Sequence, residues 1–193
     1  LTFAAALRSI LRSDPDVVLI GEIRDHETAE IAVEASLTGH LVLSTLHTND
    51  APSAITRLTE MGIEPFLVGS ALDCVLAQRL ARRLCPKCKE AYTPDPGELR
   101  AAGYPWVDGE PLPQLFRPVG CAGCAKTGYK GRLALHEVMT VSEEIERLAV
   151  QRSSGTEIGK VALAEGMHTL RTDGMHKVAK GVTSLEEILR VVA

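Results

Sequence analysis

Two short apolar runs in the first quarter of the chain have no polar face. Residues 17–21 and 40–46 are rich in valine, leucine and isoleucine, as strands buried on both sides of a parallel sheet are. Between them, residues 26–39 repeat apolar side chains with the period of a helix, and Asp25 and Gly39 are suited to begin and end it. The pattern therefore predicts a strand, a helix and a second strand parallel to the first.

Helical periodicity continues along the next part of the chain. We expect one helix with its N-cap at Asn49 or Asp50 and its end at Gly62, and a second helix from about residue 65 through residue 79. Cys74 lies on the apolar stripe of the second helix, which predicts a buried core residue.

The last part of the chain, residues 132–193, is predicted to be helical. Thr140-x-x-Glu143 and Thr183-x-x-Glu186 both match the capping box, and an apolar periodic run follows each. We expect helices to begin at these two threonines.

The segment of residues 85–131 differs from the rest of the chain in composition and in apolar pattern. It holds seven of the ten prolines, and its apolar residues follow no regular period. Such a segment buries little surface by itself and needs an additional cross-link to stay folded. The chain is therefore predicted to have three parts, residues 1–84, 85–131 and 132–193.

Composition places the chain among ordinary globular proteins. It has 193 residues, of which 45% are hydrophobic and 24% are charged, with a formal net charge of -4. No stretch approaches the roughly 18 apolar residues of a membrane-spanning helix, and the amino end does not resemble a signal peptide. We therefore expect a cytoplasmic protein. Because Leu1 enters helical periodicity at once, without a cap, we also expect the chain to be a fragment of a longer protein.

Glu22 and His47 follow the two apolar runs, at the carboxyl ends of the predicted strands. Ligands of parallel sheets bind at this edge. Nucleotide hydrolases place a strand-end acid where it holds Mg²⁺ or orients the attacking water, whereas the simpler interpretation of a single glutamate is an ion pair with Arg24. His47 stands in a polar cluster where it could contact a terminal phosphate, and a structural histidine is the alternative.

Several arginines stand close to these two residues in the sequence. Arg8 and Arg12 are four residues apart on one helical face, and Arg24 and Arg57 directly follow the motif elements. Each could be solvated surface charge, but together they are typical of a set that binds phosphate and bridges subunits. The sequence contains no G-x-x-x-x-G-K-[ST] phosphate loop.

Four of the five cysteines form two C-x-x-C pairs separated by 32 residues. Four thiolates complete the tetrahedral coordination of Zn²⁺ and leave no open position, so the predicted zinc site is structural. Redox thiols or disulfides are the alternative, but neither pair has a thioredoxin-like pattern around it. The predicted ligands are Cys85, Cys88, Cys121 and Cys124.

With these residues assembled, the chain resembles the carboxyl-terminal half of the traffic ATPases that power type II secretion and type IV pilus assembly. Residues 7–51, LRSILRSDPDVVLIGEIRDHETAEIAVEASLTGHLVLSTLHTNDA, are similar to the Walker B segment and His box of that family. Residues 165–191, EGMHTLRTDGMHKVAKGVTSLEEILRV, resemble its closing helices. The resemblance covers essentially the whole chain.

The resemblance implies an α/β fold in three parts. Residues 1–84 would be the carboxyl-terminal part of a RecA-like core, built on a partial parallel sheet with helices. Residues 85–131 would be a tetracysteine zinc-binding subdomain, and residues 132–193 a helical carboxyl-terminal subdomain.

The resemblance also implies roles for single residues. Glu22 matches the catalytic Walker B glutamate and His47 the His-box histidine, while Gly21 stands at the usual Walker B aspartate position, as is common in the family. The tetracysteine motif resembles that of the secretion and pilus-extension branch, which favours an assembly motor over a retraction motor. The arginines that match functional arginines of the family are Arg8, Arg12, Arg24, Arg57 and Arg132.

The implied protein is a hexameric ATPase that uses ATP and Mg²⁺. It is peripherally associated with the cytoplasmic, or inner, membrane, where it contacts a platform protein. The Walker A loop, the Asp box and the amino-terminal domain of the family all precede the position that matches Leu1. We therefore expect the isolated chain to be inactive.

The alternative from another functional class is a nucleic-acid-binding module that is cross-linked by zinc. In it, the basic residues of the stretch 79–89 would contact the phosphates of the nucleic acid. Stacking platforms need aromatic side chains, however, and only 4% of the residues are aromatic. Together with the net negative charge, this argues against nucleic acid as a partner. A docking and scaffold role is compatible with the ATPase assignment.

Overall fold

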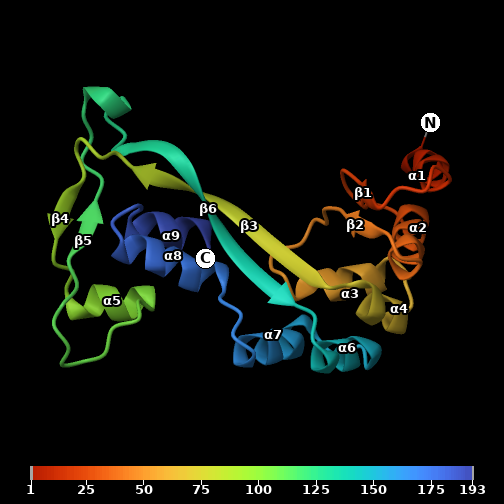
Figure 1. The fold of residues 1–193 in the computed structure, drawn as a ribbon. Helices are drawn as coiled ribbons and strands as arrows, with labels where there is room; N and C mark the ends of the chain where they lie inside the picture. Colours follow the sequence, from red (N-terminus) through yellow and green to blue (C-terminus); the bar gives the residue numbers. More distant parts are fainter. Residues whose placement is uncertain (1, 193) are drawn as a thin grey trace. The chain divides into compact units, whose positions relative to one another are not determined.

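The structure is a computed structural model that describes residues 2–192. The chain forms two compact units, each built from two segments: Leu1–Ala77 with Val138–Met167, and Gln78–Glu137 with His168–Ala193. Two long strands, β3 (Cys74–Leu84) and β6 (Tyr129–Thr140), carry the chain from one unit to the other and pair in a two-stranded sheet (Figure 1). Among the described residues, no helix is both long and apolar enough to cross a membrane.

The first unit contains the predicted strand, helix and strand. β1 (Val17–Leu19) and β2 (Leu41–Leu43) pair in parallel, with Val18 opposite Val42. The helix between them, α2 (His26–Leu37), follows α1 (Phe3–Leu11) in the chain and packs against it. Asp25 caps α2 by accepting a hydrogen bond from the Thr28 amide at 2.8 Å, and Gly39 follows the helix with a φ of +101°. The parallel unit and both ends of its helix are therefore confirmed.

The expectation that both faces of these strands are buried was wrong for the described residues. Val18 and Ile20 are buried, but Val17 is 54% exposed and Leu19 is 76% exposed. Leu41 on the second strand is likewise 51% exposed. The apolar pattern predicts that other elements pack on both faces of the sheet. In the described part of the chain, however, they cover only one face.

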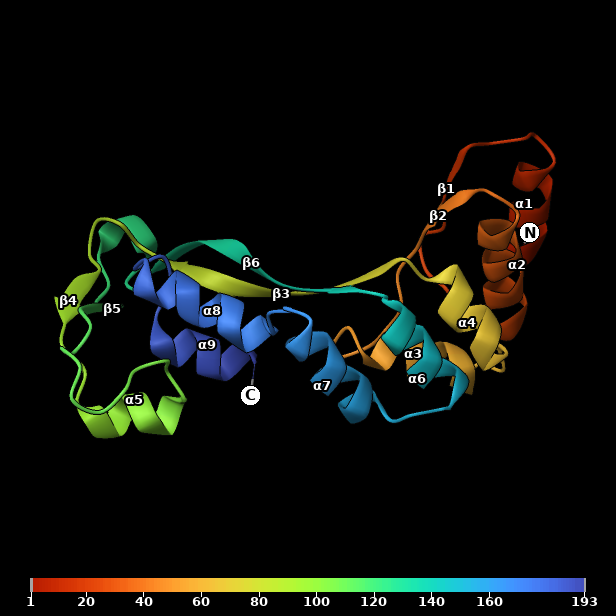
Figure 2. The ribbon, with the colours of Figure 1, turned by 60° about the horizontal axis from the view of Figure 1, so that its bottom comes forward.

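Four more helices complete the first unit. They are α3 (Ser53–Glu60), α4 (Pro65–Ala71), α6 (Glu143–Val150) and α7 (Gly155–Ala164). α4 packs against both α3 and α6, and α6 packs against α7, so segments far apart in the sequence share one core (Figure 2). Its fully or almost fully buried side chains include Ile55, Leu58, Val68, Ile145 and Ile158.

The start of α3 differs from the prediction in detail. Asp50 Oδ1 accepts a hydrogen bond from the Ser53 amide at 2.9 Å, but the backbone N-cap of the helix is Pro52. The helix ends before Gly62, which has a φ of +95°.

The single helix predicted for residues 65–79 was wrong. α4 ends at Ala71 and β3 begins at Cys74, whose side chain is exposed instead of buried. Apolar residues at positions 76, 77, 80, 81 and 84 fit a helical stripe, but they also fit a strand whose two faces are both partly apolar. Pairing with β6, more than 40 residues away in the chain, decides between the two.

The helical interpretation of residues 132–140 and both predicted helix starts were also wrong. β6 continues to Thr140, and the N-caps are Ser142 and Ser184, which accept from the amides of Ile145 and Glu187. Thr183 instead donates a hydrogen bond from its hydroxyl to the Arg82 carbonyl at 2.9 Å. A serine with an extended backbone caps the first amides of a helix as well as a threonine does. The N-cap can therefore lie one or two residues after the predicted threonine.

The second unit holds the proline-rich segment and the last two helices. β4 (Glu90–Tyr92) pairs antiparallel with β5 (Leu115–Arg117), and α5 (Pro96–Ala102) lies between them in the chain. Leu99 and Leu115 from this segment are fully buried together with Leu135 of β6 and with residues of α8 (Leu170–Ala179) and α9 (Leu185–Val191). The segment therefore shares a core with distant parts of the chain.

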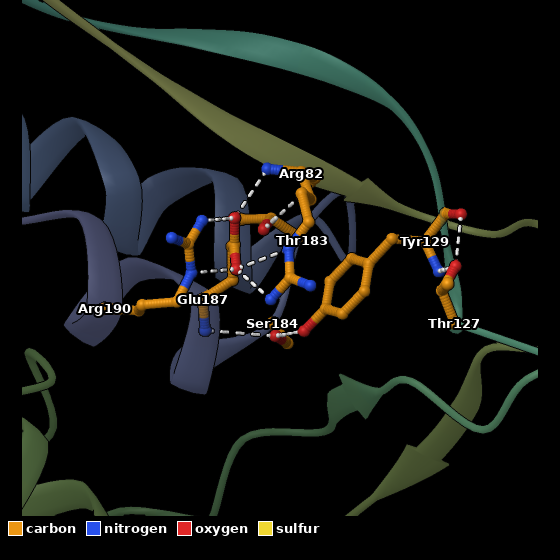
Figure 3. A network of polar contacts seen from close by, with 7 residues as sticks. All are labelled: Arg82, Thr127, Tyr129, Thr183, Ser184, Glu187 and Arg190. Atoms are coloured by element: carbon orange, nitrogen blue, oxygen red, sulfur yellow. Dashed lines mark hydrogen bonds and ion pairs between the residues drawn. The ribbon is translucent and has the colours of Figure 1, made fainter.

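A buried carboxylate joins α9 to β3 in this unit (Figure 3). The side chain of Glu187 is 0% exposed and accepts hydrogen bonds from the amide and the guanidinium of Arg82 and from the guanidinium of Arg190. Burial raises the pKa of this carboxyl, but the hydrogen bonds from Arg190 and Arg82 outweigh that effect and lower it to about 2. Beside it, the Tyr129 hydroxyl lies 2.7 Å from Ser184 Oγ, and the Arg82 guanidinium stacks over the Tyr129 ring.

Candidate functional site

The two strand ends remain paired beyond the assigned strands. The Ile20 amide donates to the Leu43 carbonyl at 2.8 Å, and the Ile23 amide donates to the Thr45 carbonyl at 3.0 Å. This continued ladder keeps the two chain segments adjacent as far as the residues that follow the strands. Glu22 and His47 are therefore neighbours, as the positions of the two strand ends predict.

In the described part of the chain, the side chains of Arg24 and His47 both contact the Oε2 atom of Glu22. Arg24 Nε lies 2.7 Å away and His47 Nε2 lies 3.2 Å away. The Glu22 side chain is 25% exposed, whereas those of Arg24 and His47 are 68% and 77% exposed. The ion pair with Arg24 is the one that the simpler interpretation of Glu22 requires, and His47 adds a contact from the second strand.

The electrostatics of this group favour the charged carboxylate. The hydrogen bond from Arg24 lowers the pKa of Glu22 below its ordinary value, and the hydrogen bond from His47 lowers it further. Glu22 is therefore ionised at neutral pH. It can accept a hydrogen bond from water, or bind a cation, at an edge of the sheet that solvent reaches.

The remaining predicted arginines lie elsewhere. Arg8 pairs with Glu27 at 2.7 Å, and Arg57 lies 3.6 Å from Glu60 one turn along its own helix. Arg12 is the C-cap of α1, and Arg132 is an exposed residue of β6 in the second unit. Within residues 2–192, no ion pair joins any of these four to Glu22.

Glu27 is a residue of this region that the sequence interpretation missed. It lies in the first turn of α2, and its ion pair with Arg8 links α1 to α2. An acid in the first turn of a helix is common because it complements the helix dipole, so its presence does not indicate a distant partner.

The two C-x-x-C pairs meet in the second unit. The four Sγ atoms all lie within 4.8 Å of one another, with Cys88 at 3.7 Å and Cys121 at 3.8 Å from Cys124. Zn–S bonds of about 2.3 Å in a tetrahedron place sulfurs about 3.8 Å apart, so the thiols have the spacing that a four-coordinate metal ion requires. A disulfide needs about 2.05 Å, and all four cysteines are free.

The backbone around the second cysteine pair is shaped for thiolate. The amides of Cys121 and Gly128 donate to Cys124 Sγ at 3.2 and 3.3 Å. Together with the hydrogen bonds from the Cys88 and Cys121 thiols, they lower the pKa of the Cys124 thiol to about 6, whereas burial raises the pKa of the neighbouring Cys88 thiol to about 12. Gly120 has a φ of +107°, and a Cβ there would lie 2.5 Å from the Lys126 carbonyl oxygen. The loop therefore requires glycine at that position to turn around the cysteines.

Comparison with known proteins places this arrangement in a family. Residues 1–190 match the family described as Type II/IV secretion system protein. The chain belongs to the Type II/IV secretion system protein family. This membership confirms the resemblance that the Walker B and His-box segments indicated.

Curated members of the Type II/IV secretion system protein family are about half identical to the chain. The type IV pilus assembly ATPase PilB of Thermus thermophilus is 54% identical over 189 residues, which are 98% of this chain and 21% of that protein. Type II secretion system protein E of Pseudomonas aeruginosa is 54% identical over 191 residues, which are 99% of this chain and 37% of that protein. The chain thus spans between about a fifth and two fifths of these relatives.

Solved structures give the same fold. The pilus retraction motor PilT with bound ADP superimposes with a TM-score of 0.66 at 25% identity, covering 98% of this chain and 43% of that chain. The Legionella pneumophila ATPase DotB superimposes with a TM-score of 0.64 at 21% identity. The mixed α/β architecture of the chain is therefore like that of PilT and DotB.

Proposed function

We propose that the chain is part of an ATPase motor that drives the assembly of pilins or pseudopilins, in type IV pilus biogenesis or in type II secretion. The observation that carries this proposal is the contact between Glu22 and His47 at the ends of two parallel strands. The curated relatives support it, because they include a pilus assembly ATPase and a type II secretion protein at equal identity. The retraction motor PilT is less similar, at 25%.

In this proposal Glu22 orients and activates the water that attacks the terminal phosphate of ATP. An ionised carboxylate at the edge of a sheet can accept the proton of a water molecule as the new bond to phosphorus forms and the bond to the departing ADP oxygen breaks. His47 contacts the γ-phosphate region from the neighbouring strand. Mg²⁺ supplies charge neutralisation on the phosphate oxygens when nucleotide is bound.

The arginines divide between the phosphates and the neighbouring subunits of a hexameric ring. Charge that develops during phosphoryl transfer is commonly stabilised by arginine, sometimes from another subunit. Arg24 is already next to Glu22, while the others lie on exposed surfaces available to a neighbour. The residues assigned to this role are Arg8, Arg12, Arg24, Arg57 and Arg132.

The cysteine cluster holds a structural Zn²⁺ through Cys85, Cys88, Cys121 and Cys124. The sulfur spacing and the free state of all four thiols support this assignment. Because four thiolates leave no open coordination position, the ion stabilises the fold and takes no part in hydrolysis.

In the cell, the motor acts in the cytoplasm at the inner membrane, docked on a platform protein of the pilus or secretion machine.

A gene replacement tests the function. Cells whose full-length gene carries Glu22→Gln should lose either surface pili or type II secretion, while the amount of the motor protein stays unchanged. Normal piliation together with normal secretion in that strain would overturn the proposal.

A further inference from the structure

One residue, Thr45, holds both peptide groups that flank Glu22. Its hydroxyl donates a hydrogen bond to the Gly21 carbonyl at 2.7 Å, and its own carbonyl accepts from the Ile23 amide at 3.0 Å. The first of these groups belongs to the peptide before Glu22 and the second to the peptide after it. Glu22 is therefore clamped on both sides to a single residue of the neighbouring segment.

Packing does not hold the peptide before Glu22. Gly21 is exposed, it has no side chain, and a Cβ built on it would meet nothing within 4 Å. After Glu22, by contrast, the side chain of Ile23 is buried and anchors the chain. Between the buried side chains of Ile20 and Ile23, the Thr45 hydroxyl thus contacts the peptide leading into Glu22 directly and restrains it.

Thr45 also precedes His47 by two residues in the segment that follows β2. His47 Nε2 lies 3.2 Å from Glu22 Oε2, so the segment that carries the hydroxyl also carries the imidazole. The two Thr45 contacts therefore tie the segment of His47 to the peptides on both sides of Glu22.

We propose that Thr45 is a positioning residue for Glu22. This inference rests on the proposed function, in which Glu22 orients the attacking water. A carboxylate that shifts by a fraction of an ångström still permits nucleotide to bind, but it no longer aligns the water. Loss of the Thr45 hydroxyl should therefore lower kcat and leave KM for ATP nearly unchanged.

Four variants of the full-length protein test this role. Thr45→Val removes the hydroxyl and keeps the branched shape, and Thr45→Ser keeps the hydroxyl. Thr38→Val is the matched control, because Thr38 also donates from its hydroxyl to a backbone carbonyl at 3.0 Å, but at the end of α2. Glu22→Gln supplies the reference for complete loss. Steady-state ATP hydrolysis and thermal unfolding are measured for each.

Thr45→Val should reduce kcat by about tenfold or more, with KM for ATP within about twofold of wild type and no change in Tm. Thr45→Ser should restore kcat to within about threefold, and Thr38→Val should match wild type. If Thr45→Val does not fold, Thr45→Ala carries the same prediction.

A normal kcat for Thr45→Val beside an inactive Glu22→Gln would overturn the Thr45 role and leave the proposed function standing. An equal loss in Thr38→Val, or no rescue by Thr45→Ser, would also overturn it. Normal hydrolysis by Glu22→Gln would overturn the proposed function itself, and the role of Thr45 with it.

Discussion

His47 Nε2 lies 3.2 Å from Glu22 Oε2, although the two residues are 25 positions apart in the sequence. A parallel pair of strands, with one helix between them, produces this contact because both strands end at the same edge. The same geometry makes Glu22 accessible to solvent and to a ligand while Arg24 and His47 keep it charged.

Removing Arg24 should raise the pKa of Glu22. The hydrogen bond from Arg24 is the larger of the two contacts that hold this pKa below 4.5, so Arg24→Gln should move it back towards that value. A lowered pKa keeps the carboxylate charged as the pH falls, and the variant should therefore take up its proton at a higher pH. An NMR titration of ¹³C-labelled glutamate carboxyls measures the change. Arg57→Gln is the control, because Arg57 pairs with Glu60. An unchanged or lower pKa in Arg24→Gln would contradict the assignment.

Glu187→Gln should destabilise the second unit by about 2 kcal/mol, because it leaves Arg82 and Arg190 without their acidic partner at a buried position. Both guanidiniums are partly exposed, which keeps the loss below that of a fully buried pair. Native-state hydrogen exchange of the α9 amides reports the free energy of opening. Glu186→Gln is the matched control, since Glu186 is the exposed neighbour on the same helix.

The same carboxylate predicts how stability depends on pH. Its folded pKa of about 2 lies below the ordinary value of 4.5, so its contribution is complete above pH 4.5 and is lost as the pH falls towards 2. The wild-type protein should lose about 2 kcal/mol more than Glu187→Gln over that interval, since the partly exposed guanidiniums weaken the effect of the pKa shift. Equal acid sensitivity of the two proteins would show that ionised Glu187 does not stabilise the folded state.

If the cysteine cluster holds the proposed zinc ion, its removal should loosen the turn between α8 and α9. Two hydrogen bonds join that turn to the residues directly before and after the first cysteine pair. The Leu84 amide donates to the Val182 carbonyl, and Lys89 Nζ donates to the Gly181 carbonyl at 2.7 Å. Cys88→Ser should therefore lower the bound zinc from about one ion per chain and speed hydrogen exchange in the turn.

The fifth cysteine supplies the control for that measurement. Cys74 is exposed and lies outside the cluster, so Cys74→Ser should keep both the zinc and the protection of the turn. Loss of zinc from Cys74→Ser, or full zinc content in Cys88→Ser, would argue against a four-cysteine site.

Local signals predicted the parts of the fold that depend on neighbours in the sequence. The strand, helix and strand around Glu22 and the approach of the four cysteines follow from periodicity, turn residues and ligand spacing. β3 was missed because its apolar positions fit a helix as well as a strand, and a distant partner decides between them.

Local sequence signals do not predict long-range polar contacts. The partners Arg82 and Glu187 are 105 residues apart, and neither has a distinctive sequence context. The clamp of Thr45 on Gly21 is similar, since a threonine after a strand is common and its acceptor is a backbone carbonyl on another segment. These contacts are decided by the packing of whole elements, which no single stretch of sequence specifies.

ATP hydrolysis by the full-length protein with Glu22→Gln tests whether Glu22 activates the attacking water. Glu30→Gln is the control, because Glu30 is an exposed acid on α2. We expect Glu22→Gln to bind ATP with near wild-type affinity but to lose at least about 99% of turnover, on the scale expected for a general base, whereas Glu30→Gln should retain full activity. Turnover by Glu22→Gln close to that of the wild type would contradict this role of Glu22.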